Sequence, residues 1–182
     1  MRIGIIGAGQ LGQMLGLAAR ELDIECLFVD PSTSPPAAVC GKVLQRPFDD
    51  PDALSELAES CDVITYEFEN VPVEALRQIE NRISVYPPVD ALRQAQDRLD
   101  EKRLFERLAI PLPGYRAVDT LDDLVTASEA HVLTLVLKTR RLCYDGKVQF
   151  VVQTRTHIDA PWRTLGGQTL NAEHWVPIDN EF

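Results

Sequence analysis

Residues 2–12, RIGIIGAGQLG, decide the fold of this chain. An apolar run over residues 2–7 leads into glycines at positions 7, 9 and 12, the G-x-G-x-x-G spacing with which a strand turns tightly into a helix. Apolar residues then recur at helical spacing from Gln10 to Leu22. The stretch predicts a strand, a glycine turn and a helix whose N-terminus can hold an anion.

Alternating strands and helices continue outward from this stretch. Two further strands are predicted at 24–30 and 42–44, and a third at 61–69, which ends in acidic residues. Helices are predicted at 52–60 and 72–80, and residues 83–88 close the series. This alternation is typical of an α/β fold with a parallel sheet covered on both faces, Rossmann-like in its glycine turn.

The pattern changes after Pro88, so we place a domain boundary near residues 88–96 and expect domains at 1–90 and 91–182. A charged helical stretch covers 89–110, and PLPGY at 111–115 breaks it. Helices are then expected at 120–130 and 156–165, and strands at 132–138, 148–152 and 169–176, with a turn at YDGK. This second part therefore reads as a small α+β unit with two or three strands.

The composition excludes several classes of protein. The chain has 182 residues, 45% of them hydrophobic and 25% charged, as in globular proteins. A net charge of -10 argues against nucleic-acid binding, which needs a basic surface. No apolar run approaches the roughly 18 residues of a membrane span. We expect a cytoplasmic protein that binds neither nucleic acid nor membrane.

The four cysteines and the first residues fit the same compartment. Cys26, Cys40, Cys61 and Cys143 form no C-x-x-C pair, and no histidine lies at metal-ligand spacing. Reduced thiols in a cytoplasmic protein are the simplest interpretation. The chain begins directly with a strand, so no signal peptide is expected.

The glycine turn alone leaves its purpose open. Asp30, 18 residues beyond Gly12, stands where the ribose-binding acid of a nicotinamide site belongs. Alternatively, the glycines serve only the turn and close packing. Gln10 is unusually polar for a dinucleotide loop, and YEFENV at 66–71 ends a later strand. Because strand ends of a parallel sheet share one edge, Glu67 and Glu69 are expected to face the loop or solvent.

Longer stretches carry a resemblance to a known family. GAGQLGQML, YEFENVP, QDRLDEKRLFERLAIPLPGYRAV, VLKTRRLCYDGK and AEHWVPIDNEF follow in order and at appropriate spacing. Together they resemble the N5-carboxyaminoimidazole ribonucleotide synthetases, ATP-grasp enzymes of purine biosynthesis. The resemblance implies a pre-ATP-grasp domain followed by a partial ATP-grasp domain. It also implies carboxylation of aminoimidazole ribonucleotide with ATP and bicarbonate.

The resemblance reassigns the opening loop from a dinucleotide to the ribonucleotide substrate. Gly9, Gln10 and Leu11 are implied to hold that substrate, together with Glu67 of the YE-E stretch. A carboxylate suits such a role because the substrate offers amine and hydroxyl donors.

The same resemblance implies an ATP site in the second part. Arg98 and Lys138 resemble the cations that meet the phosphates, and Glu173, the backbone near Val176, and Glu181 resemble the groups that meet adenine and ribose. The stretch 140–149 resembles a glycine lid over the triphosphate. Within it the implied ATP-binding residues are Cys143, Gly146 and Gln149, and the implied catalytic residues are Lys147, Tyr144 and Asp145. Only Gly146 remains of the lid's usual glycines, so we expect either a stiffer lid or a strained closed form.

The chain is expected to represent the first half of such an enzyme. The residues that hold Mg²⁺ and bicarbonate are expected in the other half, and no metal ligand is assigned here. The resemblance implies a homodimer for the whole enzyme. Two alternatives stay open: a non-catalytic nucleotide-binding module derived from the family, and a nicotinamide-dependent oxidoreductase.

Overall fold

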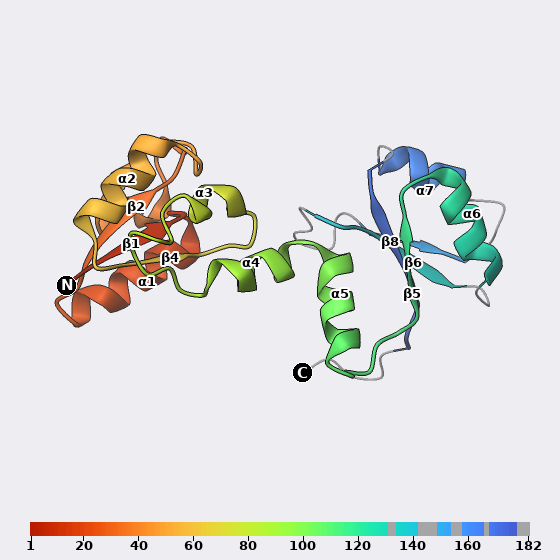
Figure 1. Ribbon diagram of the computed structural model, residues 1–182. Coiled ribbons are helices and arrows are strands. Elements are labelled where there is room, and N and C mark those ends of the chain that lie inside the picture. The colour runs from red at the N-terminus through yellow and green to blue at the C-terminus, as the bar shows by residue number, and fades with distance from the viewer. Residues whose placement is uncertain (131–133, 142–148, 154–157, 166–167, 178–182) are drawn as a thin grey trace. The chain divides into compact units, whose positions relative to one another are not determined.

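The computed structural model describes residues 1–130, 134–141, 149–153, 158–165 and 168–177. The chain divides into two compact units, Met1–Arg93 and Gln94–Phe182. Each unit contains its own four-stranded sheet (Figure 1). The expected order, a parallel-sheet α/β domain followed by a smaller α+β unit, is confirmed.

The first unit is a parallel sheet in the order β3-β2-β1-β4. Its strands are β1 (Arg2–Ile6), β2 (Glu25–Val29), β3 (Lys42–Leu44) and β4 (Val63–Tyr66). Its helices are α1 (Gln10–Glu21), the 3-10 turn η1 (Pro36–Val39), α2 (Pro51–Ser60) and α3 (Val73–Arg77). Every strand and helix predicted within residues 2–80 is present, but the strand predicted at 61–69 covers only Val63–Tyr66 and the helix predicted at 72–80 only Val73–Arg77. The turn η1 was not predicted.

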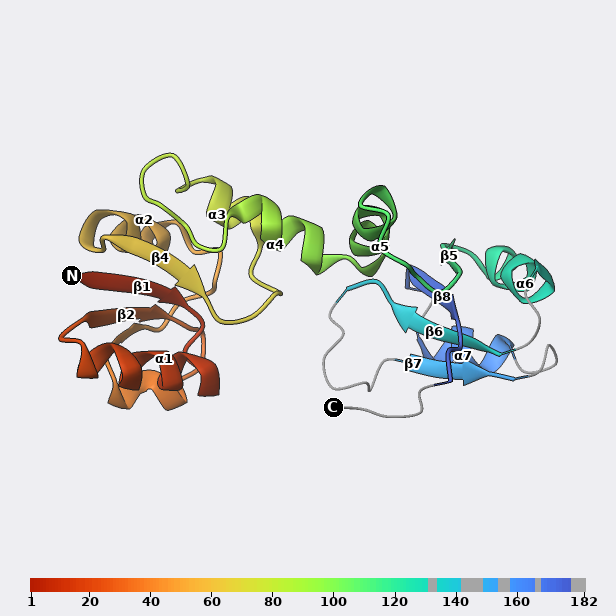
Figure 2. The same ribbon diagram turned by 90° about the horizontal axis from the view of Figure 1, so that it is seen from below.

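Both faces of this sheet are covered, as the sequence predicted (Figure 2). Against one face, α1 and η1 bury Phe28 and Ile5 of the strands. Against the other, α2 and α3 bury Ile64 and Val29. Burial of a large apolar side chain contributes about 1.5–3 kcal/mol, so the alternation of strand residues between two cores fixes the register.

Residues 83–88 form only an isolated bridge, between Val85 and Ile64, instead of another strand. Ile64 N–H donates to the Ser84 carbonyl, and Tyr86 N–H donates to the Ile64 carbonyl, both over 2.9 Å. Pro87 and Pro88 follow and have no N–H, so the ladder cannot continue.

The charged stretch 89–110 contains two helices, α4 (Val89–Gln96) and α5 (Arg98–Arg107), instead of one. Asp97 lies between them with extended backbone. Its carboxylate accepts a hydrogen bond from Leu99 N–H over 2.9 Å and so acts as the N-cap of α5. Because the Asp97 side chain bonds to a backbone N–H, the single helix predicted over 89–110 is divided at this residue.

The second unit contains an antiparallel sheet in the order β5-β8-β6-β7. Its strands are β5 (Tyr115–Val118), β6 (Leu135–Thr139), β7 (Gln149–Val152) and β8 (Leu170–His174), and its further helices are α6 (Leu121–Ala130) and α7 (Asp159–Thr164). The helices α6 and α7 lie on one side of the sheet and α5 on the other (Figure 1). The apolar core, including Leu124, Leu137 and Leu170, lies on the side of α6 and α7.

The sequence missed β5 and therefore expected at most three strands. Tyr115–Val118 is a short edge strand in which Arg116 and Ala117 are exposed, so its own residues show no buried alternation. It is held by pairing with β8, more than 50 residues later in the chain. Local pattern does not report such distant pairing.

Three described cysteines, Cys26, Cys40 and Cys61, are free thiols, while Cys143 lies outside the described residues. Burial raises the pKa of the Cys26 and Cys61 thiols, which lowers their reactivity. Across the part of the chain that the structure describes, no helix combines the length and apolar content needed to cross a bilayer.

Candidate functional sites: the glycine turn and the polar face of the second sheet

The glycine turn of the first unit is occupied by a carboxylate of the chain itself. Glu67, directly after β4, accepts hydrogen bonds from Gly9 N–H over 2.8 Å and from Gly12 N–H. These two N–H groups belong to the N-cap and third positions of α1, which has no side-chain cap of its own. The helix N-terminus, where a dinucleotide would place its pyrophosphate, therefore already holds an anion.

All three glycines of the motif make room for this carboxylate. A Cβ atom on Gly9 would lie 2.9 Å from Glu67 Oε1, and one on Gly12 would lie 2.8 Å from Glu67 Oε2. A Cβ atom on Gly7 would collide with the Glu67 side chain, and Gly7 also has a φ of +102°. The G-x-G-x-x-G spacing thus accommodates Glu67 here, which neither the dinucleotide nor the simple turn interpretation foresaw.

Asp30 is likewise turned inward. It is buried, and its two carboxylate oxygens accept from Ala8 N–H over 2.9 Å and from Ser32 N–H over 2.8 Å. The position expected for a ribose-binding acid in a nicotinamide site therefore secures the loop backbone. This geometry removes the support that Asp30 gave to the oxidoreductase alternative.

The other residues assigned to the ribonucleotide lie at the open end of the same turn. Gln10 and Leu11 are the first two residues of α1, and both side chains are exposed. Their N–H groups have no acceptor among the described residues, since the first N–H groups of a helix have no partner within the helix. Glu69 is exposed beyond Glu67. The structure thus brings Gly9, Gln10, Leu11 and Glu67 together.

The second sheet has a polar face opposite its apolar core. In the antiparallel register Lys138 of β6 lies beside Gln149 of β7 on one side and beside Asn171 of β8 on the other. Glu173 lies two residues beyond Asn171 and therefore shares its face. Of the residues assigned to ATP, the pleat places Lys138, Gln149 and Glu173 on this one face.

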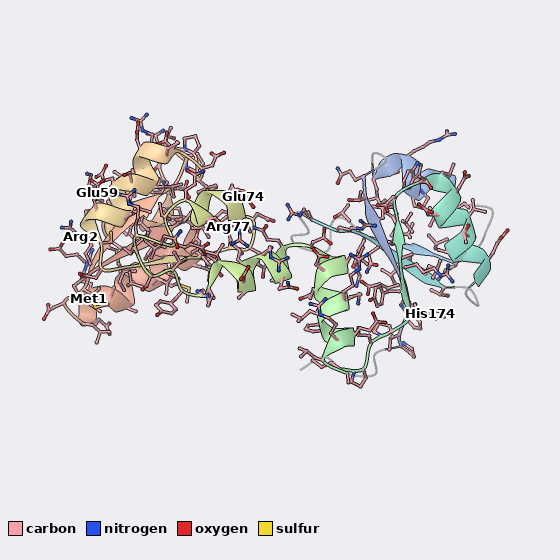
Figure 3. The ribbon with its side chains drawn as sticks, viewed as in Figure 1. Met1, Arg2, Glu59, Glu74, Arg77 and His174 are labelled. Carbon is pink, nitrogen blue, oxygen red and sulfur yellow. The ribbon has the colours of Figure 1, made fainter. Side chains whose placement is uncertain are left out.

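Glu173 is the centre of a charge cluster on this face. Its Oε2 lies 3.1 Å from Lys138 Nζ and 3.3 Å from Lys102 Nζ of α5, while Asn171 Nδ2 donates to its Oε1 over 2.9 Å. The Glu173 side chain is only 7% exposed, against 13% for Lys102 and 23% for Lys138. Side chains fill the space between α5 and the sheet, and His174 ends β8 nearby (Figure 3).

Lys102 and Asn171 are functional candidates that the sequence analysis missed. Lys102 lies four residues after Arg98, one turn along the same face of α5. Asn171 alternates with Glu173 along β8 and is fully buried, and its Oδ1 has no hydrogen-bond partner among the described residues. Helical spacing from Arg98 and strand alternation from Glu173 are the signals that could have found them.

Arg98 and Val176 lie at the margins of this face. Arg98 N–H donates to the Arg140 carbonyl over 3.0 Å, which joins the start of α5 to the end of β6. Its side chain is half-buried, and its Nε is enclosed without an acceptor among the described residues. Val176 follows β8 and is exposed.

The remaining residues assigned to the ATP site lie outside the described residues: Cys143, Tyr144, Asp145, Gly146, Lys147 and Glu181. Within the described ranges, no group of three or more histidine, cysteine, aspartate or glutamate side chains could hold a metal ion. The residues in hand therefore support no Mg²⁺ ligand set.

Tyr115 completes the cluster from β5. Its hydroxyl donates to Glu106 Oε2 over 2.9 Å, and Lys102 Nζ lies 5.8 Å from the centre of its ring. Burial, with help from the Glu106 hydrogen bond, raises the pKa of the Tyr115 phenol. Lys102 is thus held between the Glu173 carboxylate and an aromatic face.

Comparison with known proteins agrees with both units. The ribonucleotide synthetase preATP-grasp domain matches residues 1–96, and the ATP-grasp domain matches residues 103–182. N5-carboxyaminoimidazole ribonucleotide synthase of Pseudomonas aeruginosa is 39% identical over 181 residues, which cover 100% of this chain and 50% of that protein. The chain thus spans about half the length of the curated relatives it matches.

Solved structures match equally well. The N5-carboxyaminoimidazole ribonucleotide synthetase of Thermus thermophilus superposes with a TM-score of 0.87 at 43% identity, over 97% of this chain and 48% of that one. The Aspergillus clavatus N5-carboxyaminoimidazole synthase, solved with ADP and 5-aminoimidazole ribonucleotide, gives 0.85 at 27% identity, over 96% and 46%. The glycine turn, the polar sheet face and these matches identify the chain as a member of the N5-carboxyaminoimidazole ribonucleotide synthetase family of ATP-grasp proteins.

Proposed function

We propose that this chain supplies the ribonucleotide site and part of the ATP site of an enzyme that carboxylates aminoimidazole ribonucleotide with ATP and bicarbonate in purine biosynthesis. The observation that carries the proposal is the polar face on which Lys138, Gln149 and Glu173 meet. The ADP and 5-aminoimidazole ribonucleotide bound by the Aspergillus clavatus relative support the same two ligands here.

The nucleotide belongs on the second unit because two lysine side chains gather there on a covered face of the sheet. Lys138 and Lys102 bring two positive charges to one carboxylate, which leaves the cluster with a net charge of about +1 for a phosphate to neutralise. Arg98 adds a further cation at the start of α5. Val176 is exposed, and its backbone has no hydrogen-bond partner among the described residues, so it can bond to a base edge.

The ribonucleotide belongs at the glycine turn. A carboxylate offers about four lone-pair positions, and Glu67 uses two of them for Gly9 and Gly12. The others can accept from an amine or hydroxyl of the ribonucleotide, while the N–H groups of Gln10 and Leu11 can donate to it. The residues that bind Mg²⁺ and bicarbonate, and the contact of a homodimer, belong to the whole enzyme in this proposal. We also propose that the protein is cytoplasmic.

Calorimetric titration with aminoimidazole ribonucleotide tests the proposal directly. Wild-type chain should bind it, and Glu67→Gln should weaken binding by about tenfold, since a charged hydrogen bond is worth roughly 1.5–3 kcal/mol. Glu69→Gln, an exposed neighbour, is the matched control and should change affinity less than about twofold. Equal affinity of wild type and Glu67→Gln would contradict the assignment.

A non-catalytic nucleotide-binding module derived from the family remains the second candidate, because the lid-like stretch 140–149 keeps only Gly146 of the lid's usual glycines. It predicts that the chain binds ATP without releasing phosphate. ATP- and bicarbonate-dependent carboxylation by the purified chain would eliminate it.

A further inference from the structure

We infer that Lys102 is a positioning residue of the nucleotide site: its ammonium holds the Glu173 carboxylate so that Lys138 can leave that carboxylate for a nucleotide phosphate. The inference rests on the proposed nucleotide binding by the second unit. It starts from a geometric fact, that both ammonium groups contact the same oxygen, Glu173 Oε2, over 3.3 and 3.1 Å.

Because Glu173 is buried, its charge must be balanced by neighbouring cations. At 7% side-chain exposure the carboxylate is nearly removed from water, so an uncompensated charge there would be strongly disfavoured. With one lysine, any move of that lysine toward a ligand would strand the carboxylate. With two, one can leave while the other and Asn171 Nδ2 still satisfy both oxygens.

The surroundings decide which lysine leaves. Lys102 is 13% exposed and has a second anchor, the Tyr115 ring, 5.8 Å from its Nζ. Lys138 is 23% exposed, and Glu173 is its one acceptor among the described residues. Lys138 also lies beside Gln149, the exposed first residue of the edge strand β7. Lys138 is therefore the donor that can be redirected, and Lys102 the one that remains.

A second observation points to a ligand at the same place. Asn171 is fully buried, donates to Glu173 through Nδ2, and leaves Oδ1 without a partner among the described residues. Buried polar atoms are almost always satisfied, so an acceptor held beside this cluster fits a donor brought by a ligand. The nucleotide's amine or hydroxyl groups are donors of that kind.

The test compares the affinities of ADP and adenosine for wild type, Lys102→Met and Lys102→Arg, each shown by thermal unfolding to be folded. Lys102→Met should weaken ADP by on the order of tenfold, because Lys138 must then abandon a buried carboxylate to reach phosphate. Adenosine should change less than about threefold, since it places no charge on Lys138. Lys102→Arg should restore ADP affinity. A merely structural role would weaken both ligands alike.

Arg103→Met is the matched control, because it removes the same charge from the next residue of α5, where the side chain is 54% exposed and paired with Asp100. It should leave ADP affinity within about twofold. Equal ADP affinities for wild type and Lys102→Met, or equal losses for ADP and adenosine, would overturn the inference.

A readout without nucleotide separates this inference from the proposed function. Acetic anhydride should modify Lys138 several-fold more slowly in Lys102→Met than in wild type, because Glu173 then holds the protonated amine alone. Peptide mass spectrometry measures that rate, and Arg103→Met should match wild type. If wild type binds no ADP, the proposed function fails and the nucleotide role of Lys102 fails with it, whereas an unchanged Lys138 rate in a chain that does bind ADP overturns the inference alone.

Discussion

The two units each hold a glutamate beside the predicted ligand sites, and they hold it in different ways. Glu67 is bonded to backbone N–H groups of Gly9 and Gly12, which are fixed by the start of α1. Glu173 is bonded to the side chains of Lys102, Lys138 and Asn171. Backbone donors cannot leave without unwinding a helix, whereas lysine side chains can turn to a ligand. The first acid is therefore a fixed part of its loop, and the second belongs to a cluster that can rearrange.

The largest expected effect comes from Glu173→Gln. This change leaves two largely covered ammonium groups facing a neutral amide, so the free energy of unfolding should fall by about 2–3 kcal/mol. Denaturant unfolding measures it. Glu56→Gln is the control, because its 2.9 Å pair with Lys42 is exposed, and it should cost less than about 0.5 kcal/mol. Equal losses would show that the cluster is no more than a surface pair.

Glu67→Ala should have the next largest effect, a loss of about 1–2 kcal/mol, as for other helix N-caps. Amide hydrogen exchange should localise the change to the first turn of α1, with faster exchange at Gly9 and Gly12. Uniformly faster exchange across the first unit would mean that Glu67 acts through the core and not as a cap.

Gly9→Ala sharpens the same point. Its Cβ would lie 2.9 Å from Glu67 Oε1, while the other nearby Glu67 atoms lie 3.7 and 3.8 Å away. In the wild-type background, Gly9→Ala should therefore lower the free energy of unfolding by about 1 kcal/mol. In the Glu67→Ala background, the same substitution should lower it much less. A double-mutant cycle of unfolding free energies measures this coupling. Strict additivity would refute the claim that the motif's glycines make room for Glu67.

The smallest effect is a pH dependence at Asp123, another acid held by helix N-terminal donors. Hydrogen bonds from the Thr120 hydroxyl, then from Asp119 and Thr120 N–H, lower the pKa of Asp123 below its usual 3.8. The pKa of Asp123 is lower in the folded than in the unfolded chain, so its ionised form stabilises the folded state. That contribution is present above about pH 4 and is lost as the pH falls through the lowered pKa. Carboxyl NMR titration should give a midpoint below 3.8, and Thr120→Val should raise it.

The sequence predicted the first unit well because its information is local. The glycine spacing at residues 7–12 and the buried strand at 24–30 define a strand-turn-helix-strand unit without reference to the rest of the chain. The family resemblance was equally secure because it rests on long stretches. The register of β6 with β7 and β8 then put Lys138, Gln149 and Glu173 on one face.

What sequence reasoning missed depends on contacts between distant residues. The strand Tyr115–Val118 exists through pairing with β8, and the contact of Lys102 with Glu173 joins residues 71 positions apart. Asp30 matched a ribose-binding acid by spacing, yet Ala8 and Ser32 hold its carboxylate. Spacing along the sequence identifies which residues lie at an edge of the sheet, but not which groups of the chain form hydrogen bonds with them.

We expect nucleotide to bind the Lys102–Lys138–Glu173 cluster of the second unit and not the glycine turn of the first. Calorimetric titration of ADP into wild type, Lys138→Met and Glu67→Gln tests it most directly. Wild type should bind ADP, Lys138→Met should lose about tenfold or more in affinity, and Glu67→Gln should change within about threefold. Lost binding in Glu67→Gln with Lys138→Met unaffected would contradict it and return the nucleotide to the glycine loop.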